Sequence, residues 1–208
     1  MEKSEALLLL SGGIDSPIAG FLTLKNKIGL SAVHFSTEKF TGKESIEKAQ
    51  KLCKLIGIRK LFIADTSTAF EEISKKTEHK LYFVITKRLM FRAAERIAEK
   101  NGMQFLVSGE NIGQVSSQTL SNLTVIDRAV SIPVIRPLLS LDKMQIVAIA
   151  SSTGSFEISK GPEMCDYLGP KHPATKATEE WVKKEEEKLN IDQLVQEMLS
   201  NLQEKEIS

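Results

Sequence analysis

The sequence predicts an α/β protein with a doubly wound, parallel, five-stranded sheet and a C-terminal helical extension. Short apolar segments alternate with longer segments of helical periodicity, which is typical of a parallel sheet covered by helices on both faces. The chain has 208 residues, which is long for one small domain and short for two. We therefore expect one domain over residues 1–177, followed by a helical appendage over residues 178–208.

Strands and helices are expected to alternate along the larger domain. Strands are predicted at residues 6–10, 30–35, 60–64, 105–107 and 134–135. Helices are predicted at residues 17–27, 44–56, 81–100 and 142–151, with a further one beginning near residue 68. Residues 41–44 and 68–71 match capping boxes that would begin two of these helices. Gly57 and Gly102 stand where two of the helices should end.

This fold class also predicts where a ligand binds. In open parallel sheets, ligands lie beyond the carboxyl ends of the strands, at the point where the strand order reverses. That rule places four segments along one edge of the sheet: residues 11–16, 34–36 and 108–113, and the residues that follow Ile135.

The turn after the first strand has the composition of a phosphate-binding loop. Gly12 and Gly13 lack Cβ atoms, so their backbone can turn sharply and approach an anion closely. Pro17 suits a first helical position, where its missing N–H costs nothing. The free N–H groups and the positive end of the helix dipole would then face a bound phosphate.

Three polar residues of the same loop make an ordinary strand–turn–helix corner a poor explanation, because a corner needs only the glycines. Ser11 and Ser16 add hydroxyl donors. The Asp15 carboxylate would repel phosphate unless a magnesium ion lies between them. We therefore expect Asp15 to hold magnesium through the phosphates of a nucleotide.

The sequence resembles a known family at this loop and at several later motifs. The loop has no lysine after its glycines, unlike the loop of kinases and GTPases, and it resembles the SGGxDS loop of PP-loop ATP pyrophosphatases. The longer motif GENIGQVSSQT occupies residues 109–119 and is far more specific. Together with residues 87–94, 133–138, 162–165 and 171–176, it resembles the tRNA 4-thiouridine synthase family, also called the thiamine biosynthesis sulfurtransferases. The resemblance runs from about Leu7 to Ala177 and implies an adenine nucleotide alpha-hydrolase-like fold.

The resemblance implies an ATP site and a reaction in two steps. Uridine O4 of tRNA would attack the α-phosphate of ATP and release pyrophosphate; a persulfide or sulfide would then deliver sulfur to C4, and AMP would leave. Cys165 matches the sulfur-handling cysteine of the family, so Cys165 and Asp15 are the expected catalytic residues. The expected ATP-binding residues are Leu9, Leu10, Ser11, Gly12, Gly13, Asp15, Ser16, His34, Phe35, Lys87, Gly109 and Gln118.

Several of these residues also have simpler interpretations. Lys87 would otherwise be a surface lysine, and His34 is expected to contribute backbone contacts without transferring a proton. Cys53 recurs at helical spacing with apolar residues and is expected to be a packing residue. Cys165 lies in a loop where Lys160 or Lys171 would favour its thiolate.

Composition and charge bound the location and partners. Two cysteines make no disulfide framework, and the first apolar run is too short for a signal peptide or a membrane span, so we expect a cytoplasmic protein. The net charge of +1 does not by itself indicate nucleic acid. Basic residues on and before the long helix are candidates for RNA contact: Lys75, Lys76, Lys80, Lys87, Arg88 and Arg92.

Because few residues flank the predicted domain, we expect an isolated catalytic module without the family's usual RNA-binding and rhodanese-like domains. We therefore expect separate RNA-binding and sulfur-donor proteins as partners. Near the end of the chain an apolar stripe recurs at helical spacing over residues 191–202. It would either fold back onto the core or form a homodimer contact.

The loop alone leaves other functions open. The runner-up is an adenylating enzyme that acts on a small molecule, as an amidotransferase-like synthetase does. Sulfur transfer for the thiazole of thiamine, and a nucleotide sensor without catalysis, are weaker alternatives.

Overall fold

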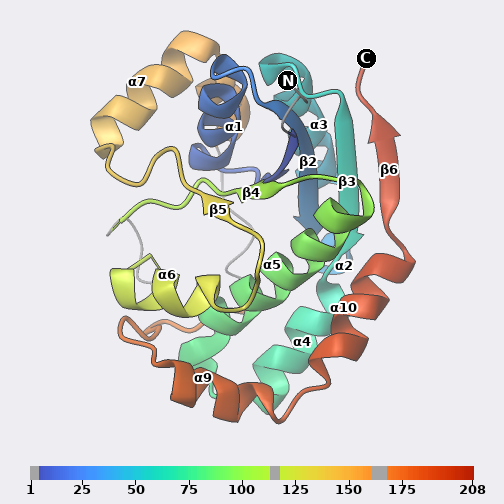
Figure 1. Cartoon of the computed structure of the whole chain (residues 1–208), viewed down its shortest axis with the longest axis vertical. Helices are drawn as coiled ribbons and strands as arrows, with labels where there is room; N and C mark the ends of the chain where they lie inside the picture. Colours follow the sequence, from blue (N-terminus) through green and yellow to red (C-terminus); the bar gives the residue numbers. More distant parts are fainter. Residues whose placement is uncertain (1–4, 113–117, 161–167) are drawn as a thin grey trace.

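A computed structural model describes residues 5–112, 118–160 and 168–208 of the chain. Its centre is a six-stranded sheet with the order β5-β4-β1-β2-β3-β6 (Figure 1). The strands are β1 (Glu5–Leu9), β2 (Gly29–Ser36), β3 (Lys60–Asp65), β4 (Phe105–Val107), β5 (Val134–Ile135) and β6 (Gln203–Glu206). The first five run parallel, as the sequence predicts.

The sixth strand corrects the predicted strand count. β6 pairs antiparallel with β3 at the sheet edge, where Leu61 lies opposite Lys205, and Lys60 forms an ion pair of 2.7 Å with Glu204. Its sequence, QEKE, has no apolar alternation because an edge strand can remain largely in contact with solvent. The pattern that predicts buried strands therefore gives no sign of it.

One face of the sheet is covered by two helices that follow β3, one that follows β4 and two near the end of the chain. They are α4 (Ser67–Lys76), α5 (Tyr82–Lys100), α6 (Leu120–Asp127), α9 (Glu179–Glu186) and α10 (Ile191–Ser200). The short 3₁₀ helix η1 (His79–Leu81) leads into α5. Leu7 and Leu9 of β1 and Val33 of β2 point into this layer and pack against α5 residues such as Leu89.

The opposite face is covered by α1 (Asp15–Lys25), α3 (Glu44–Ile56), α7 (Lys143–Thr153) and α8 (Ser155–Ser159). Ala6, Leu8 and Leu10 alternate with the residues of the first face and join this second core, which also contains Cys53. A strand that is apolar on both faces is what a doubly wound sheet requires. The predicted fold class is therefore confirmed.

Two helix starts differ from the predicted capping boxes. A short helix, α2 (Glu38–Thr41), precedes α3, and α3 begins after Lys43 without a side-chain cap. Thr66 precedes α4, and the first turn of that helix is held by Asp65, whose carboxylate accepts the Ser67 N–H at 2.9 Å. The predicted ends are correct, because Gly57 and Gly102 have left-handed φ angles of 86° and 69°.

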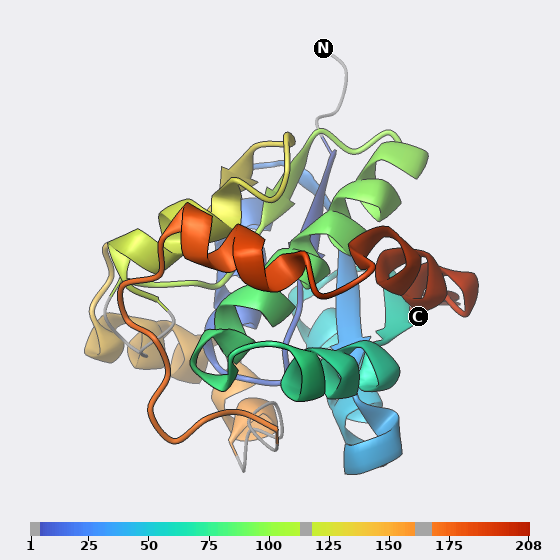
Figure 2. The same ribbon diagram turned by 90° about the horizontal axis from the view of Figure 1, so that it is seen from below.

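The apolar stripe near the C-terminus packs onto the rest of the chain. α9 and α10 lie against α5 (Figure 2), and Leu194, Val195 and Met198 are buried in the core of that layer. These side chains are therefore not available for a dimer contact. A homodimer stays a prediction, but it would need a surface other than this stripe.

A buried ion pair joins α9 to α5. Arg88 is 2 % exposed and donates two hydrogen bonds, of 2.8 and 2.9 Å, to the Glu186 carboxylate. Arg92 donates two more, of 2.7 and 3.0 Å, to the same group. Burial alone would raise the pKa of Glu186, but the hydrogen bonds and charges of the two arginines hold it below its ordinary value. Arg88 therefore cannot reach RNA phosphate, which corrects its place among the RNA-contact candidates.

Candidate nucleotide-binding site

A cavity of about 500 Å³ lies at the carboxyl ends of β1, β2 and β4. The strand order reverses between β1 and β4, so the cavity stands at the predicted switch point. The loop after β1 forms one wall. Side chains of the opposite wall come from α5 and from the chain after residue 168, and include Tyr82, Phe83, Met90, Phe91, Pro170 and Pro173.

Hydrogen bonds within the loop fix its shape. The Ser11 N–H donates to Ser16 Oγ at 2.9 Å, and the Gly13 N–H donates to Ser11 Oγ at 3.2 Å. The two serine hydroxyls are 3.0 Å apart. Helix α1 begins at Asp15, so Pro17 is its third residue. The prediction that Pro17 is the first helical residue is therefore wrong. Its missing N–H still falls within the first turn, where no helical acceptor is available.

Gly109 presses the loop after β4 against the start of α1. A Cβ atom at Gly109 would stand 2.6 Å from both the nitrogen and the Cα of Ser16, and 2.8 Å from the carbonyl carbon of Asp15. These are backbone atoms that no rotamer change can move away. The two loops therefore meet only because residue 109 is glycine.

Asp15 faces the cavity and forms an ion pair with Lys143 at the start of α7. The Nζ–Oδ1 distance is 3.2 Å, and the Asp15 side chain is 24 % exposed. The capping box of Asp142 and Gln145 begins this helix and fixes the position of Lys143. The motif at residues 142–143 is thereby brought to the loop from a distant part of the chain.

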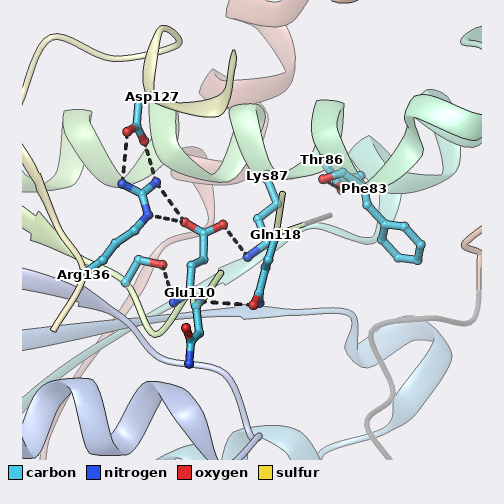
Figure 3. Close-up of polar contacts among 9 residues, drawn as sticks. Phe83, Thr86, Lys87, Glu110, Gln118, Asp127 and Arg136 are labelled. Atoms are coloured by element: carbon cyan, nitrogen blue, oxygen red, sulfur yellow. Dashed lines mark hydrogen bonds and ion pairs between the residues drawn. The ribbon is translucent and has the colours of Figure 1, made fainter. Parts of the chain in front are cut away.

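A line of charged groups reaches the cavity from its other side (Figure 3). Lys87 of α5 donates to Glu110 Oε1 at 2.9 Å, and Arg136, which follows β5, donates to Glu110 Oε2 at 2.9 Å. Arg136 also pairs with Asp127 at the end of α6. Burial alone would raise the pKa of Glu110, but the charges and hydrogen bonds of Lys87 and Arg136 hold it below its ordinary value.

His34 joins the ends of β1 and β2. Its Nδ1 lies 3.0 Å from the Leu10 carbonyl oxygen, and because a carbonyl only accepts, Nδ1 carries the hydrogen. Burial lowers the pKa of the imidazole, so the ring is neutral and Nε2 is an acceptor. That nitrogen is buried without a hydrogen-bond partner among the described residues. The expectation that His34 transfers no proton stays a prediction.

The segment that begins at residue 168 is held beside the cavity by contacts to its main chain. The Phe83 ring occupies the space beside Gly169 that a side chain would need. A Cβ atom added at residue 169 would lie only 2.3 Å from the nearest ring carbon. His79 contacts the Leu168 carbonyl through Nε2 at 2.8 Å, and the Ala174 N–H donates to Lys80 at 2.8 Å.

Residues at the start of α6 hold the same segment further along. The Thr119 hydroxyl donates to the Thr175 carbonyl at 2.7 Å, and the Ser121 hydroxyl donates to the Ala177 carbonyl at 2.8 Å. Asn122 is fully buried, and its amide donates to the Ala174 carbonyl at 2.8 Å.

The structure brings the predicted ATP-binding residues together, with one exception. Leu9, Leu10, Ser11, Gly13, Asp15, Ser16, His34, Phe35, Lys87, Gly109 and Gln118 all line the cavity. Gly12 is outside this set and lies against Lys48, whose Cδ would be 3.0 Å from an added Cβ. Lys87 is thus no ordinary surface lysine. Cys165 lies outside the described residues, and its role remains a prediction.

Sequence reasoning missed three charged residues that form ion pairs with the predicted site residues or with one another. Glu110, Arg136 and Lys143 were within recognised motifs, but only their spatial contacts give them a place at the cavity. A charged residue in an otherwise apolar stretch, such as Arg136 between Ile135 and Pro137, is the one signal that could have indicated a buried partner.

Cys53 is buried on α3, as its helical spacing predicts. Burial raises the pKa of its thiol to about 12. We expect iodoacetamide at pH 8 to leave Cys53 unmodified in the folded protein and to alkylate it in denaturant, because alkylation needs an accessible thiolate. Peptide mass spectrometry measures both states. Equal rates of modification in the two states would contradict the burial.

The described part of the chain presents neither a metal cluster nor a bilayer-spanning helix. No group of three or more His, Cys, Asp or Glu side chains in it is placed to hold a metal ion. None of its helices has both the length and the hydropathy that crossing a membrane requires.

The strand order and the serine- and glycine-containing loop at the switch point make this chain a doubly wound α/β protein with an anion-binding loop. The family model described as "Thiamine biosynthesis protein (ThiI)" matches residues 2–191. The chain belongs to this ThiI family.

Individual relatives agree with that assignment. A probable tRNA sulfurtransferase of Finegoldia magna is 38 % identical over 97 % of this chain and 53 % of its own length. One of Moorella thermoacetica is 39 % identical over 95 % of this chain and 52 % of its own length. The chain thus spans about half the length of the curated relatives that it matches.

Two solved structures place the fold among known ones. A 4-thiouridine synthetase in complex with RNA and ATP superposes with a TM-score of 0.93 and 36 % identity, over 99 % of this chain and 55 % of that one. The NMN synthetase of Francisella tularensis, at 15 % identity and a TM-score of 0.59, covers 99 % of this chain and 79 % of that one. The second likeness concerns the fold alone.

Proposed function

We propose that this chain binds ATP and adenylates a uridine of tRNA, so that sulfur can replace O4 and give 4-thiouridine. The observation that carries the proposal is the loop of residues 11–16, which is locked by Gly109 and opens onto a cavity of about 500 Å³ at the sheet's switch point. The 4-thiouridine synthetase that resembles this chain along its length has ATP bound.

The first step is the attack of uridine O4 on the α-phosphate, with pyrophosphate as the leaving group. The loop N–H groups and the Lys87 ammonium would bind the phosphates and stabilise the charge that develops on them. Asp15 would hold a magnesium ion together with phosphate oxygens, since one carboxylate alone is too few ligands for magnesium. That ion would neutralise phosphate charge when bound.

The second step forms a C–S bond at C4 and breaks the C–O bond to AMP. We propose Cys165 as the residue that handles the sulfur, in the form of a persulfide. Its sulfane sulfur would attack C4, and a thiol reductant would then cleave the S–S bond. Free sulfide would perform the same substitution without that cleavage. The donor is proposed to be a separate persulfide protein or sulfide, and tRNA recognition is proposed to involve a further RNA-binding protein.

Incubation of the chain with ATP, magnesium, sulfide and unmodified tRNA should yield AMP, pyrophosphate and a thiolated uridine. Asp15→Asn is expected to lower the rate of pyrophosphate release by about 100-fold, the usual cost of removing one electrostatic contact to the reacting phosphates. Chromatography of the nucleotides and mass spectrometry of the tRNA nucleosides measure both outcomes.

The matched control is Asp192→Asn, which makes the same chemical change at a side chain that is 89 % exposed on α10, and it should retain full turnover. Cys165→Ala should abolish thiolation from a persulfide donor, and unchanged turnover would remove Cys165 from the mechanism. Formation of ADP in place of AMP would overturn the proposal. Pyrophosphate release with a small acid or ammonia, and without tRNA, would instead favour a small-molecule acceptor.

A further inference from the structure

We propose that Glu110 is a positioning residue for nucleotide binding: its carboxylate fixes the Lys87 ammonium at the cavity, and Arg136 holds that carboxylate in place. The inference rests on the proposed function, which makes Lys87 a contact of the ATP phosphates. It assigns to Glu110 a role through another residue and no contact with the nucleotide itself.

The two oxygens of Glu110 are divided between two cations. Oε1 accepts from Lys87 and Oε2 accepts from Arg136, each at 2.9 Å (Figure 3). The Glu110 side chain is 2 % exposed, and its backbone N–H donates to Ser108 Oγ at 3.3 Å. Rotation of the carboxylate would break one of these bonds, so the direction of the Oε1–Lys87 contact is fixed.

The Arg136 side of the arrangement is also fixed. Arg136 is 8 % exposed, it donates to both oxygens of Asp127, and its guanidinium lies 6.0 Å from the centre of the Phe91 ring. Such a bidentate pair gives the planar guanidinium a defined orientation. Arg136 therefore cannot follow Glu110 if the carboxylate moves, which makes it a rigid anchor.

Lys87 is the movable member of the group. Its side chain is 28 % exposed and faces the cavity, and lysine carries a compact charge on a flexible stem. One N–H is directed to Glu110, which leaves the ammonium's other donors for a ligand. Glu110 itself lines the cavity, and a carboxylate would repel phosphate, so its ion pair with Lys87 is the arrangement in which Glu110 can assist anion binding.

A purely structural role would give a different result from a positioning role, and a double-mutant cycle separates the two. The variants are Glu110→Gln, Lys87→Met and the double substitution, and the measured quantity is the Kd for ATP by calorimetry. We expect Glu110→Gln to weaken ATP binding by about tenfold in the wild-type background, and to change it by less than about twofold when Lys87 is already methionine. Equal effects in both backgrounds would overturn the proposal.

The matched control is Glu95→Gln on the same helix as Lys87. Its carboxylate accepts the backbone N–H groups of Ser131 and Ile132 at 2.6 and 2.9 Å, away from the cavity. This variant should lose stability and keep its ATP affinity. A loss of ATP affinity as large as that of Glu110→Gln would show a general effect of destabilisation and overturn the proposal. If Glu110→Gln does not fold, Glu110→Asp, which retains the charge and shortens the reach, takes its place in the cycle.

A second readout does not depend on ATP. The rate of reductive methylation of Lys87, followed by peptide mass spectrometry with the exposed Lys54 as an internal reference, should rise at least about threefold in Glu110→Gln. An unchanged rate would show that Glu110 does not hold the ammonium and would overturn the inference. If the wild-type chain fails to bind ATP while this rate still rises, the proposed function has failed and the contact between Glu110 and Lys87 stands.

Discussion

Replacement of Arg88 by alanine should lower the free energy of unfolding by about 3 kcal/mol, because the buried Glu186 carboxylate loses two hydrogen bonds and keeps only the more exposed Arg92 as a partner. Arg88 is 2 % exposed and Glu186 is 9 % exposed, so water cannot replace the lost guanidinium. The substitution also removes a donor from the Val125 carbonyl. Chemical denaturation followed by circular dichroism measures the change.

Two further measurements test this explanation. Arg96→Ala is the matched control, because Arg96 is 43 % exposed and pairs with the exposed Asp192; we expect a change within about 0.5 kcal/mol. Because the pKa of Glu186 is lowered on folding, its stabilising contribution is present above the pKa of the unfolded carboxyl and is lost as the pH falls through the folded value. The difference between wild type and Arg88→Ala should therefore shrink below about pH 4. A difference that grows on acidification would contradict the ion pair.

Gly109→Ala should abolish ATP turnover while the rest of the fold persists. The new Cβ would meet Ser16 backbone atoms at 2.6 Å, so either the loop after β4 or the start of α1 must move. Displacement by about 1 Å near a reacting group can cost 10²-fold in rate, and we expect a loss of at least that size. Pyrophosphate release and the Kd for ATP are the measurements.

A second glycine separates this local effect from general destabilisation. Gly57 ends α3 with a φ of 86° and has open space around it, so Gly57→Ala strains the backbone far from the cavity. That variant should lose about 1 kcal/mol of stability and keep its ATP affinity. ATP affinity retained by Gly109→Ala would show that the two loops are not pressed together as described.

The parallel strands were predictable because each is apolar on both faces. Residues 105–107 and 134–135 form strands with the predicted bounds, although the second is only two residues long. β6 was not predictable, because QEKE is polar and its place depends on the exposed edge of β3. The capping boxes failed for a related reason. At α4, the Thr66 N–H and hydroxyl donate to the Ser36 carbonyl, a tertiary contact that overrides the local preference.

The part of the candidate site that faces the cavity was predictable because it lies in contiguous motifs at the ends of strands. The ion pairs within it were not. Glu110 and Arg136 are 26 positions apart, and Lys143 and Asp15 are 128 apart. Spacing along the chain cannot reveal such pairs, since only the folded sheet brings them together. The same holds for Arg88 and Glu186, which are 98 positions apart.

The segment at residues 174–177 is held through its main chain, while the side chains that hold it belong to Thr119, Ser121 and Asn122. Every residue type offers the same carbonyl oxygen, so these contacts do not depend on which amino acids occupy positions 174–177. The exposed positions 175 and 176 can therefore change without altering the path of the chain, whereas Ala174 and Ala177 pack into the core and must stay small. A library that alters the wall formed by Pro170 and Pro173 can therefore vary positions 175 and 176 and leave the three anchoring side chains untouched.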